Sequence, residues 1–237
     1  MDLAFRNRAE EMMDDPNMEL EVLQKAYDDI NLCNRILGGE SITIKAVWKI
    51  IQNSKQESYT ILDMGCGDGT MLLKLSDFLS KNGVFHKMRG IDQRADVLAI
   101  AKRKSRNHPN IEFTKMDILK ADDSLKSDIV INTLTMHHFE EERIEAFLSK
   151  FIQLAKLGIV INDLERSRIS YVLFKLFSAV FIKTDVAKND GLVSISKGFK
   201  KRELQELSEK IPNVTHQIRW KWAFRYVWVM KINRQFN

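Results

Sequence analysis

The feature that most constrains the fold of this chain is a regular alternation of short apolar runs with longer segments of helical spacing. From residue 58 onward the runs are rich in Ile and Val and read TILDMG, KMRGID, IEFTKMD, DIVINT and GIVINDL. Helical spacing fills segments between them, over 70–81, 95–105 and 140–156. Because strands separated by helices form right-handed crossover units, this alternation predicts a mainly parallel sheet buried on both faces. Ligands of such sheets bind beyond the carboxyl ends of the strands.

The two ends of the chain differ from this middle part. Residues 1–57 are expected to be helical, because apolar residues recur at three- and four-residue steps until Gly38–Gly39 interrupts them. The tail contains two aromatic runs, VTHQIRWKW and FRYVWVMKI, which predict an antiparallel hairpin at the edge of the sheet. We therefore expect one structural domain, in which a helical extension over 1–57 caps the α/β part at 58–237.

Length and composition fit this expectation and narrow the class of protein. A chain of 237 residues with 44% hydrophobic residues can build one large α/β domain. The excess of 37 basic over 32 acidic residues permits a nucleic-acid partner without requiring one. With only two cysteines, the sequence implies neither a disulfide framework nor a cysteine-based zinc site. The charged N-terminus lacks the apolar core of a signal peptide, so we expect a cytoplasmic protein.

Three glycines at alternate positions follow the first apolar run, in LDMGCGDGT. Glycine at the end of a strand lets the chain turn sharply and lets a ligand approach the backbone. The spacing of Gly65, Gly67 and Gly69 departs from the G-x-G-x-x-G pattern of dinucleotide sites. Asp63 and Asp68 lie beside these glycines, and their carboxylates would repel a pyrophosphate. The stretch therefore favours a ligand that carries positive charge.

LDMGCGDG resembles motif I of the class I S-adenosylmethionine-dependent methyltransferases. The resemblance implies a Rossmann-like fold with a seven-stranded, mostly parallel sheet, a C-terminal antiparallel hairpin and helices on both faces. It implies S-adenosylmethionine as cofactor, with S-adenosylhomocysteine as product, and no metal. In this family the acidic residue of motif I helps hold the methionine amino group of the cofactor. Asp63 occupies that position in this sequence. The backbone from Gly65 through Cys66 to Gly67 would then lie beneath the methionine and ribose.

Three further stretches extend the expected cofactor site. Asp92 ends the second run about 25 residues beyond the glycine loop, where an acid binds the ribose diol, and Gln93 would lie along the adenine. Asp117 and the amide of Ile118 match the family's contact to the adenine amino group, although a turn aspartate is the alternative for Asp117. The backbone of Asn132 and Thr133 would receive the methionine ammonium.

Candidate catalytic residues should follow the fourth and fifth strands, beside the expected sulfonium. A general base assists methyl transfer to a phenol at neutral pH, and His137 and His138 in TMHHF are candidates. Packing against the cofactor and capping of the next helix are the alternatives for each histidine. Asp163 could bind substrate or orient a histidine. Arg166 could bind an anion, although a surface ion pair is the preferred interpretation.

The segment RISYVLFKLFSAVFIKTD follows the fifth strand and is apolar on nearly all sides. It is too short and too charged for a comfortable membrane span, so we expect a helical insertion over 167–185 that covers the acceptor site. Tyr171 and Phe174 would contact an apolar or aromatic acceptor. A homodimer interface, added core and membrane-surface association are the alternatives. The next stretch, KNDGLVSISKGF, is expected to be a turn and a loop that brings Asp190 to the acceptor.

The longer pattern resembles a bacterial subgroup of small-molecule methyltransferases associated with type III polyketide synthases. This resemblance implies secondary metabolism and O-methylation of a phenolic or resorcinol-like acceptor; carbon methylation of a quinone or polyketide ring stays open. The chain lacks the Asn/Asp-Pro-Pro-aromatic run of exocyclic-amine methyltransferases, having NTLT there. An RNA acceptor is the less favoured alternative, since the basic run KRKSR is typical of a solvated helix face.

Overall fold

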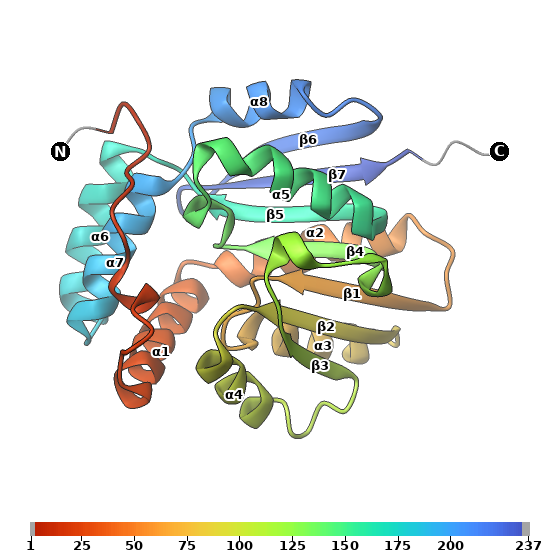
Figure 1. Ribbon diagram of the computed structural model, residues 1–237, viewed down its shortest axis with the longest axis horizontal. Coiled ribbons are helices and arrows are strands. Elements are labelled where there is room, and N and C mark those ends of the chain that lie inside the picture. The colour runs from red at the N-terminus through yellow and green to blue at the C-terminus, as the bar shows by residue number, and fades with distance from the viewer. Residues whose placement is uncertain (1–2, 234–237) are drawn as a thin grey trace.

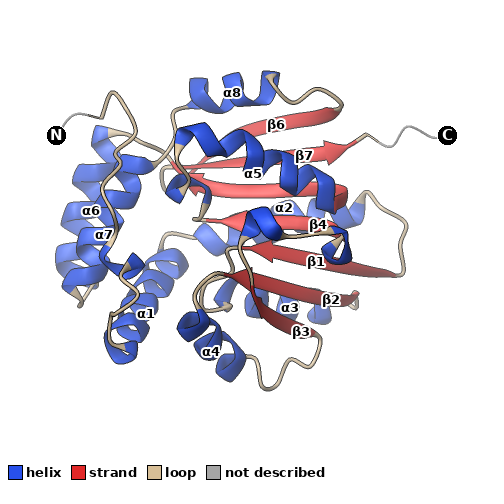
Figure 2. Ribbon diagram, viewed as in Figure 1, coloured by secondary structure: helices blue, strands red, loops and turns tan. Residues whose placement is uncertain are grey.

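The computed structural model describes residues 3–233, which form a seven-stranded sheet with helices on both faces (Figures 1 and 2). The strands are β1 (Ser58–Met64), β2 (Phe85–Asp92), β3 (Ile111–Lys115), β4 (Ser127–Thr133), β5 (Ala155–Leu164), β6 (Val214–Lys221) and β7 (Arg225–Ile232). Their order in the sheet is β3-β2-β1-β4-β5-β7-β6. The first five are parallel, and β7 runs antiparallel to both β5 and β6. The predicted fold class is confirmed.

Helices cover the sheet in two layers and also close its carboxyl end. They are α1 (Leu20–Ile36), α2 (Gly39–Gln52), α3 (Thr70–Lys81), α4 (Ala95–Lys104), α5 (Glu141–Leu154), α6 (Arg168–Phe181), α7 (Asp185–Lys197) and α8 (Lys201–Glu209). One face carries α2, α3 and α4, and the other carries α5 and α8. The parallel strands point toward α1, α6 and α7, at the left of Figure 1. These three helices therefore surround the end of the sheet where ligands bind.

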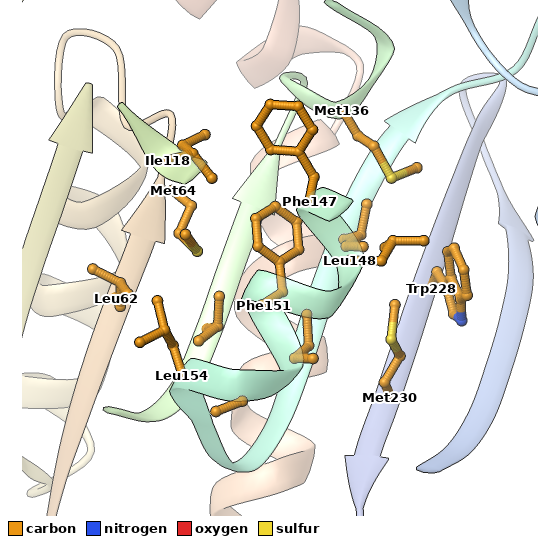
Figure 3. Packing of buried hydrophobic residues seen from close by; sticks show 14 of the residues in the cluster. Leu62, Met64, Ile118, Met136, Phe147, Leu148, Phe151, Leu154, Trp228 and Met230 are labelled. Atoms are coloured by element: carbon orange, nitrogen blue, oxygen red, sulfur yellow. The ribbon is translucent and has the colours of Figure 1, made fainter. Parts of the chain in front are cut away.

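The core explains why the middle of the chain forms these layers. Adjacent residues on a strand point to opposite faces, so Ile61 packs with α2 and α3 while Leu62 packs with α5. On the face that α5 covers, Phe147 and Phe151 of α5 belong to the same buried cluster as Trp228 of β7 (Figure 3). Full burial of a side chain of this size contributes about 1.5–3 kcal/mol. The two-sided burial requires the nearly continuous apolar runs seen in the sequence.

Two predicted segments have a different structure. The expected helical character of the N-terminus fails before Leu20, because residues 3–19 are mostly extended with one 3₁₀ turn at Met12–Asp14. This part lacks helical apolar spacing, and Pro16 disfavours a helix just before it. The predicted loop around Asp190 is instead part of helix α7. A Cβ at Gly191 would lie 2.2 Å from the Phe174 ring, so this glycine permits close helix packing and does not mark a turn.

No helix within residues 3–233 is long and apolar enough to cross a bilayer. Helix α6 has the most apolar surface, and it spans 14 residues.

Candidate active site

A cavity of about 910 Å³ lies beyond the carboxyl ends of the parallel strands, against α1, α6 and α7. Many of the residues predicted for the site line it: Asp63, Gly65, Cys66, Gly67, Asp92, Gln93, Ile118, Thr133, His137, His138, Phe174 and Asp190. Five others do not: Asp117, Asn132, Asp163, Arg166 and Tyr171. The structure therefore brings the predicted cofactor loop and the two histidines to one cavity.

The glycine loop needs its glycines for two reasons. Gly65 and Gly67 have φ angles of +85° and +51°, and residues with a Cβ atom rarely adopt such positive values. A Cβ on Gly65 would also lie 2.4 Å from Thr135, and one on Gly67 would lie 3.2 Å from the Tyr27 ring. The N–H of Gly67 donates to the Asp92 carboxylate at 3.0 Å, which fixes the loop to the end of β2. The loop is thus shaped to hold backbone close to a ligand.

Asp63 carries a buried carboxylate with unused hydrogen-bonding capacity. Its side chain is 1% exposed, and Oδ1 has no hydrogen-bond partner among the described residues. Burial, together with the negative charge of Asp92, raises the pKa of Asp63 to about 8. Burial also raises the pKa of Asp92, although its carboxylate accepts N–H bonds from Gly67 and Arg94. A cationic ligand group near these two acids would stabilise their ionised forms.

His137 and Asp163 form a buried pair at the other side of the cavity. Nδ1 of His137 lies 2.6 Å from Oδ1 of Asp163, and the His137 backbone N–H donates to Oδ2 at 3.0 Å. Burial alone would raise the pKa of Asp163, but His137 and the N–H of Leu164 outweigh it, and the pKa is lowered. The ionised carboxylate therefore accepts Nδ1–H and orients the imidazole ring. Nε2 is buried and makes no hydrogen bond within residues 3–233.

A second acid from the N-terminal segment reaches both histidines. The Glu11 carboxylate lies 3.8 Å from Nε2 of His137 and 3.7 Å from Nε2 of His138, and Lys197 approaches it at 3.4 Å. Burial alone would lower the pKa of His138, but contact with Asp14 and the charges of Glu11 and Asp14 raise it. The atoms of Glu11, His137 and His138 are close enough to hold a metal ion. Lys197, a buried cation beside Glu11, opposes such an ion.

Two of the predicted cofactor residues act on the protein itself. Asp117 caps the short 3₁₀ turn Ile118–Lys120, accepting from the N–H of Leu119 at 2.9 Å. This is the turn role that the sequence left open. The amide of Asn132 donates to the carbonyl of Met64 at 2.5 Å, so its side chain ties β4 to β1. Thr133 lines the cavity, and its hydroxyl meets that of Thr43 at 3.2 Å.

The predicted acceptor residues divide in the same way. Arg166 is buried, pairs with Glu203 and donates to the carbonyl of Gly198, so its ion pair is internal and not at the surface. Asp190 lines the cavity, but its carboxylate accepts the N–H groups of Met12 and Met13, both at 2.8 Å. Phe174 lines the cavity, whereas Tyr171 on the same helix does not. Asp190 thus anchors the N-terminal segment.

Helix α6 has two apolar faces. Leu173, Phe174 and Phe177 line the cavity. The residues of the opposite arc are exposed: Ile169 at 65%, Val172 at 55%, Leu176 at 63% and Val180 at 75%. The helix therefore covers one side of the cavity and also presents an apolar stripe to its surroundings.

Several cavity residues were missed by the sequence analysis. Glu11 comes from a segment with no recognisable motif. Tyr27 and Asn31 come from α1, where Tyr27 belonged to the apolar repeat and carried no separate signal. Arg225 comes from the start of β7, in a run that predicted only a strand. Each reaches the cavity through the packing of elements distant in sequence.

Comparison with known proteins finds similarity to methyltransferases. Residues 61–158 match the family model of a methyltransferase domain. The chain has the class I methyltransferase fold. An uncharacterized methyltransferase of Bacillus cytotoxicus is 29% identical over 125 residues, which are 51% of this chain and 55% of that relative. The chain thus spans about half the length of this curated relative. The matched part of the chain is thus similar to methyltransferase domains.

Solved structures give the same fold over most of the chain. The plantazolicin methyltransferase BpumL, in complex with a triazolic desmethylPZN analog and SAH, has a TM-score of 0.68 at 15% identity. The match covers 90% of each chain. Magnesium protoporphyrin IX methyltransferase from Synechocystis PCC 6803, with bound SAH, has a TM-score of 0.61 at 14% identity, covering 90% of this chain and 93% of that one. At these identities the likeness is one of fold.

Proposed function

We propose that this protein is an S-adenosylmethionine-dependent methyltransferase that methylates a small apolar acceptor, most favourably at a phenolic or resorcinol-like oxygen. One observation carries the proposal: Asp63, with an oxygen that makes no hydrogen bond, and His137, whose Nε2 makes none, line the same cavity. The first suits a cationic cofactor, and the second suits a hydroxyl that must lose its proton.

The residues around the glycine loop fit the proposed cofactor. Asp63 would pair with the methionine ammonium, either directly or through water, and both oxygens of Asp92 can accept further bonds from ribose hydroxyls. Gln93 and Ile118 line the part of the cavity where the adenine would lie. When bound, the cofactor supplies an electrophilic methyl group on a sulfonium. Tyr27, packed against Gly67, helps exclude water from this end.

His137 is the proposed general base. Asp163 accepts Nδ1–H, so the neutral imidazole would carry its lone pair at Nε2. Nε2 would accept the proton that the acceptor hydroxyl loses when its oxygen is methylated. The ionised Asp163 stabilises the imidazolium that forms. Asp163 acts through His137 and is therefore a positioning residue.

The cavity wall favours an apolar acceptor. Leu173, Phe174 and Phe177 of α6 give one side of the cavity an aliphatic and aromatic lining. The same base could assist carbon methylation of a phenolic or quinone ring, so that reaction remains the second candidate. RNA is less favoured, because the residues that α6 contributes to the lining are mostly apolar. Homodimer formation through the exposed stripe of α6 and a cytoplasmic role in secondary metabolism stay predictions.

The test begins with calorimetric titration of S-adenosylhomocysteine into the protein. Labelled S-adenosylmethionine is then supplied with alkylresorcinols, simple phenols or total RNA. We expect binding and transfer of label to a phenol. His137→Ala should lower kcat by about 10²- to 10⁴-fold while leaving S-adenosylhomocysteine affinity within twofold; His216→Ala, far along β6, is the matched control. Absence of binding would refute the cofactor, and label found only in RNA would refute the acceptor.

A further inference from the structure

Arg225 is a buried cation without a counter-ion. It begins β7, its residue is 3% exposed, and Nη2 donates to the side-chain oxygen of Asn34 at 2.7 Å. Nε and Nη1 have no hydrogen-bond partner among the described residues. No carboxylate within residues 3–233 lies within 4.0 Å of the guanidinium, since the ion pairs found there do not include it. The side chain lines the reaction cavity.

The nearest ionisable groups are engaged elsewhere or neutral. Asp163 and Glu40 both act on Arg225 through their charge. Asp163 is held by His137, and Glu40 pairs with Lys74. Burial raises the pKa of the Cys33 thiol to about 11, so it is uncharged near neutral pH. Arg225 therefore has no ion-pair partner among the described residues, although both acids favour its charged form at longer range.

The surrounding backbone is built to admit this guanidinium. A Cβ on Gly39 would lie 2.8 Å from Cζ of Arg225 and about as close to both terminal nitrogens. Glycine at this position thus lets the guanidinium lie against the start of α2. An uncompensated buried charge costs folding free energy unless something pairs with it. Arg225 is one of the residues that line the cavity, so a ligand bound there can supply this partner.

The sheet order locates Arg225 relative to the expected cofactor. Three strand spacings separate β1, which carries Asp63, from β7. At about 4.8 Å per spacing, the two strands are roughly 14 Å apart. Arg225 pairs in register with Leu164 at the end of β5, and both line the cavity together with Phe224 and Leu37. This end of the cavity is apolar and lies across from the glycine loop.

We propose that Arg225 binds an anionic oxygen of the methyl acceptor, either a carboxylate or a phenolate, at the β7 end of the cavity. This inference rests on the proposed function, because only a methyltransferase has a methyl acceptor. The planar guanidinium of Arg225 can donate to both oxygens of one carboxylate, and burial strengthens such hydrogen bonds. The acceptor is then amphipathic: an apolar body lies against α6 and one anionic group lies at Arg225.

The experiment compares two aromatic probes, 1-naphthoate and the neutral 1-naphthalenemethanol, by calorimetry with and without saturating S-adenosylhomocysteine. The wild type should bind the naphthoate at least tenfold more tightly. Arg225→Met should remove that preference and leave S-adenosylhomocysteine affinity within twofold. Its Tm should be unchanged or higher, because an unpaired buried charge is replaced by an apolar side chain. Arg143→Met is the matched control, since Arg143 lines the cavity but is exposed.

Three results would overturn the proposal. Unchanged naphthoate preference in Arg225→Met would give Arg225 no role in anion binding. A loss confined to S-adenosylhomocysteine would assign the guanidinium to the cofactor carboxylate instead. A large fall in Tm would mark Arg225 as structural. If the wild type binds naphthoate but not S-adenosylhomocysteine, the proposed function fails while Arg225 remains an anion site, so the two failures are distinguishable.

Discussion

At the scale of single residues, the site is a set of buried polar atoms that the fold leaves without partners. Asp63, His137 and Arg225 each have such an atom, and each lines the same cavity. A buried polar group without a partner is destabilising by about 1–3 kcal/mol, and more for a charge. Ligand binding can recover this free energy. Under the two proposals above, these residues would bind a cation at Asp63, a hydroxyl at His137 and an anion at Arg225.

The raised pKa of Asp63 gives the first of these a measurable consequence. With a pKa of about 8, Asp63 holds its proton at pH 7 in the free protein. An ammonium group bound beside it favours the carboxylate, so the pKa falls and a proton is released. We predict release of nearly one proton per S-adenosylhomocysteine bound at pH 7, and less at pH 9, where Asp63 is already ionised. Calorimetry in phosphate and in Tris, which differ in ionisation enthalpy, measures this number.

Asp63→Asn should bind more weakly and release no proton through this group. Asp117→Asn is the control, because Asp117 caps Leu119 outside the cavity and its loss should leave the release intact. Equal proton release by the wild type and Asp63→Asn would contradict the assignment.

The residues that could be predicted from the sequence are those whose role depends on local chain geometry. Asp63, the glycines and Asp92 lie at strand ends, where a short motif fixes both the backbone turn and the ligand contact. Glu11 and Arg225 could not be predicted, because their positions depend on packing between segments more than 100 residues apart. The pairing of His137 with Asp163 was one of two alternatives, and only the close contact between β5 and the turn after β4 favours it.

At the scale of elements, helices α6 and α7 show how a sequence signal can be misread. Glycine at 191 and the polar residues before it indicated a turn, yet they lie inside α7. Glycine lowers helix propensity by about 1 kcal/mol relative to alanine, which tertiary packing can outweigh. Here the packing partner is Phe174 of α6, whose ring occupies the space that a Cβ would need. The strands and most helices were predictable because their apolar spacing is dictated by burial alone.

This contact predicts a specific effect of Gly191→Ala. The new Cβ would force the Phe174 ring, and with it α6, away from α7, and overpacking of this kind costs about 1–3 kcal/mol. Because Phe174 lines the cavity, KM for an apolar phenol should rise severalfold while S-adenosylhomocysteine affinity stays nearly constant. Steady-state kinetics and thermal unfolding measure the two effects.

Gly83→Ala serves as the matched control for Gly191→Ala. Its φ of +72° makes alanine strained by about 1–2 kcal/mol, yet no atom lies within 4 Å of the added Cβ. We expect it to lower stability without changing KM. A rise in KM for both variants would show that general destabilisation, and not the helix contact, controls the acceptor end of the cavity.

At the scale of the whole molecule, the N-terminal segment runs along α7 at the carboxyl side of the sheet (Figure 1). Arg6 donates to the carbonyls of His137 and Phe139, and Asn7 bonds to Ser196, so contacts reach over more than 130 residues. Glu11 then lies near Nε2 of both histidines. No periodic pattern in the sequence predicts the path of this segment, because most of its hydrogen bonds are to other elements. Its position completes the cavity wall that the sheet and α6 leave open.

The last prediction concerns the anchor of this segment. Asp190→Ala would remove the acceptor of two N–H groups, those of Met12 and Met13, and each buried group left unpaired costs about 1–3 kcal/mol. Residues 3–15 should therefore lose hydrogen-exchange protection while the strands keep theirs. Arg8→Ala is the control, since its pair with Glu142 is exposed to solvent and contributes little to stability. Faster exchange throughout the sheet would make Asp190 a support of the whole fold. If hydrogen exchange is unchanged and KM for the acceptor rises, Asp190 contacts the acceptor and does not anchor the segment.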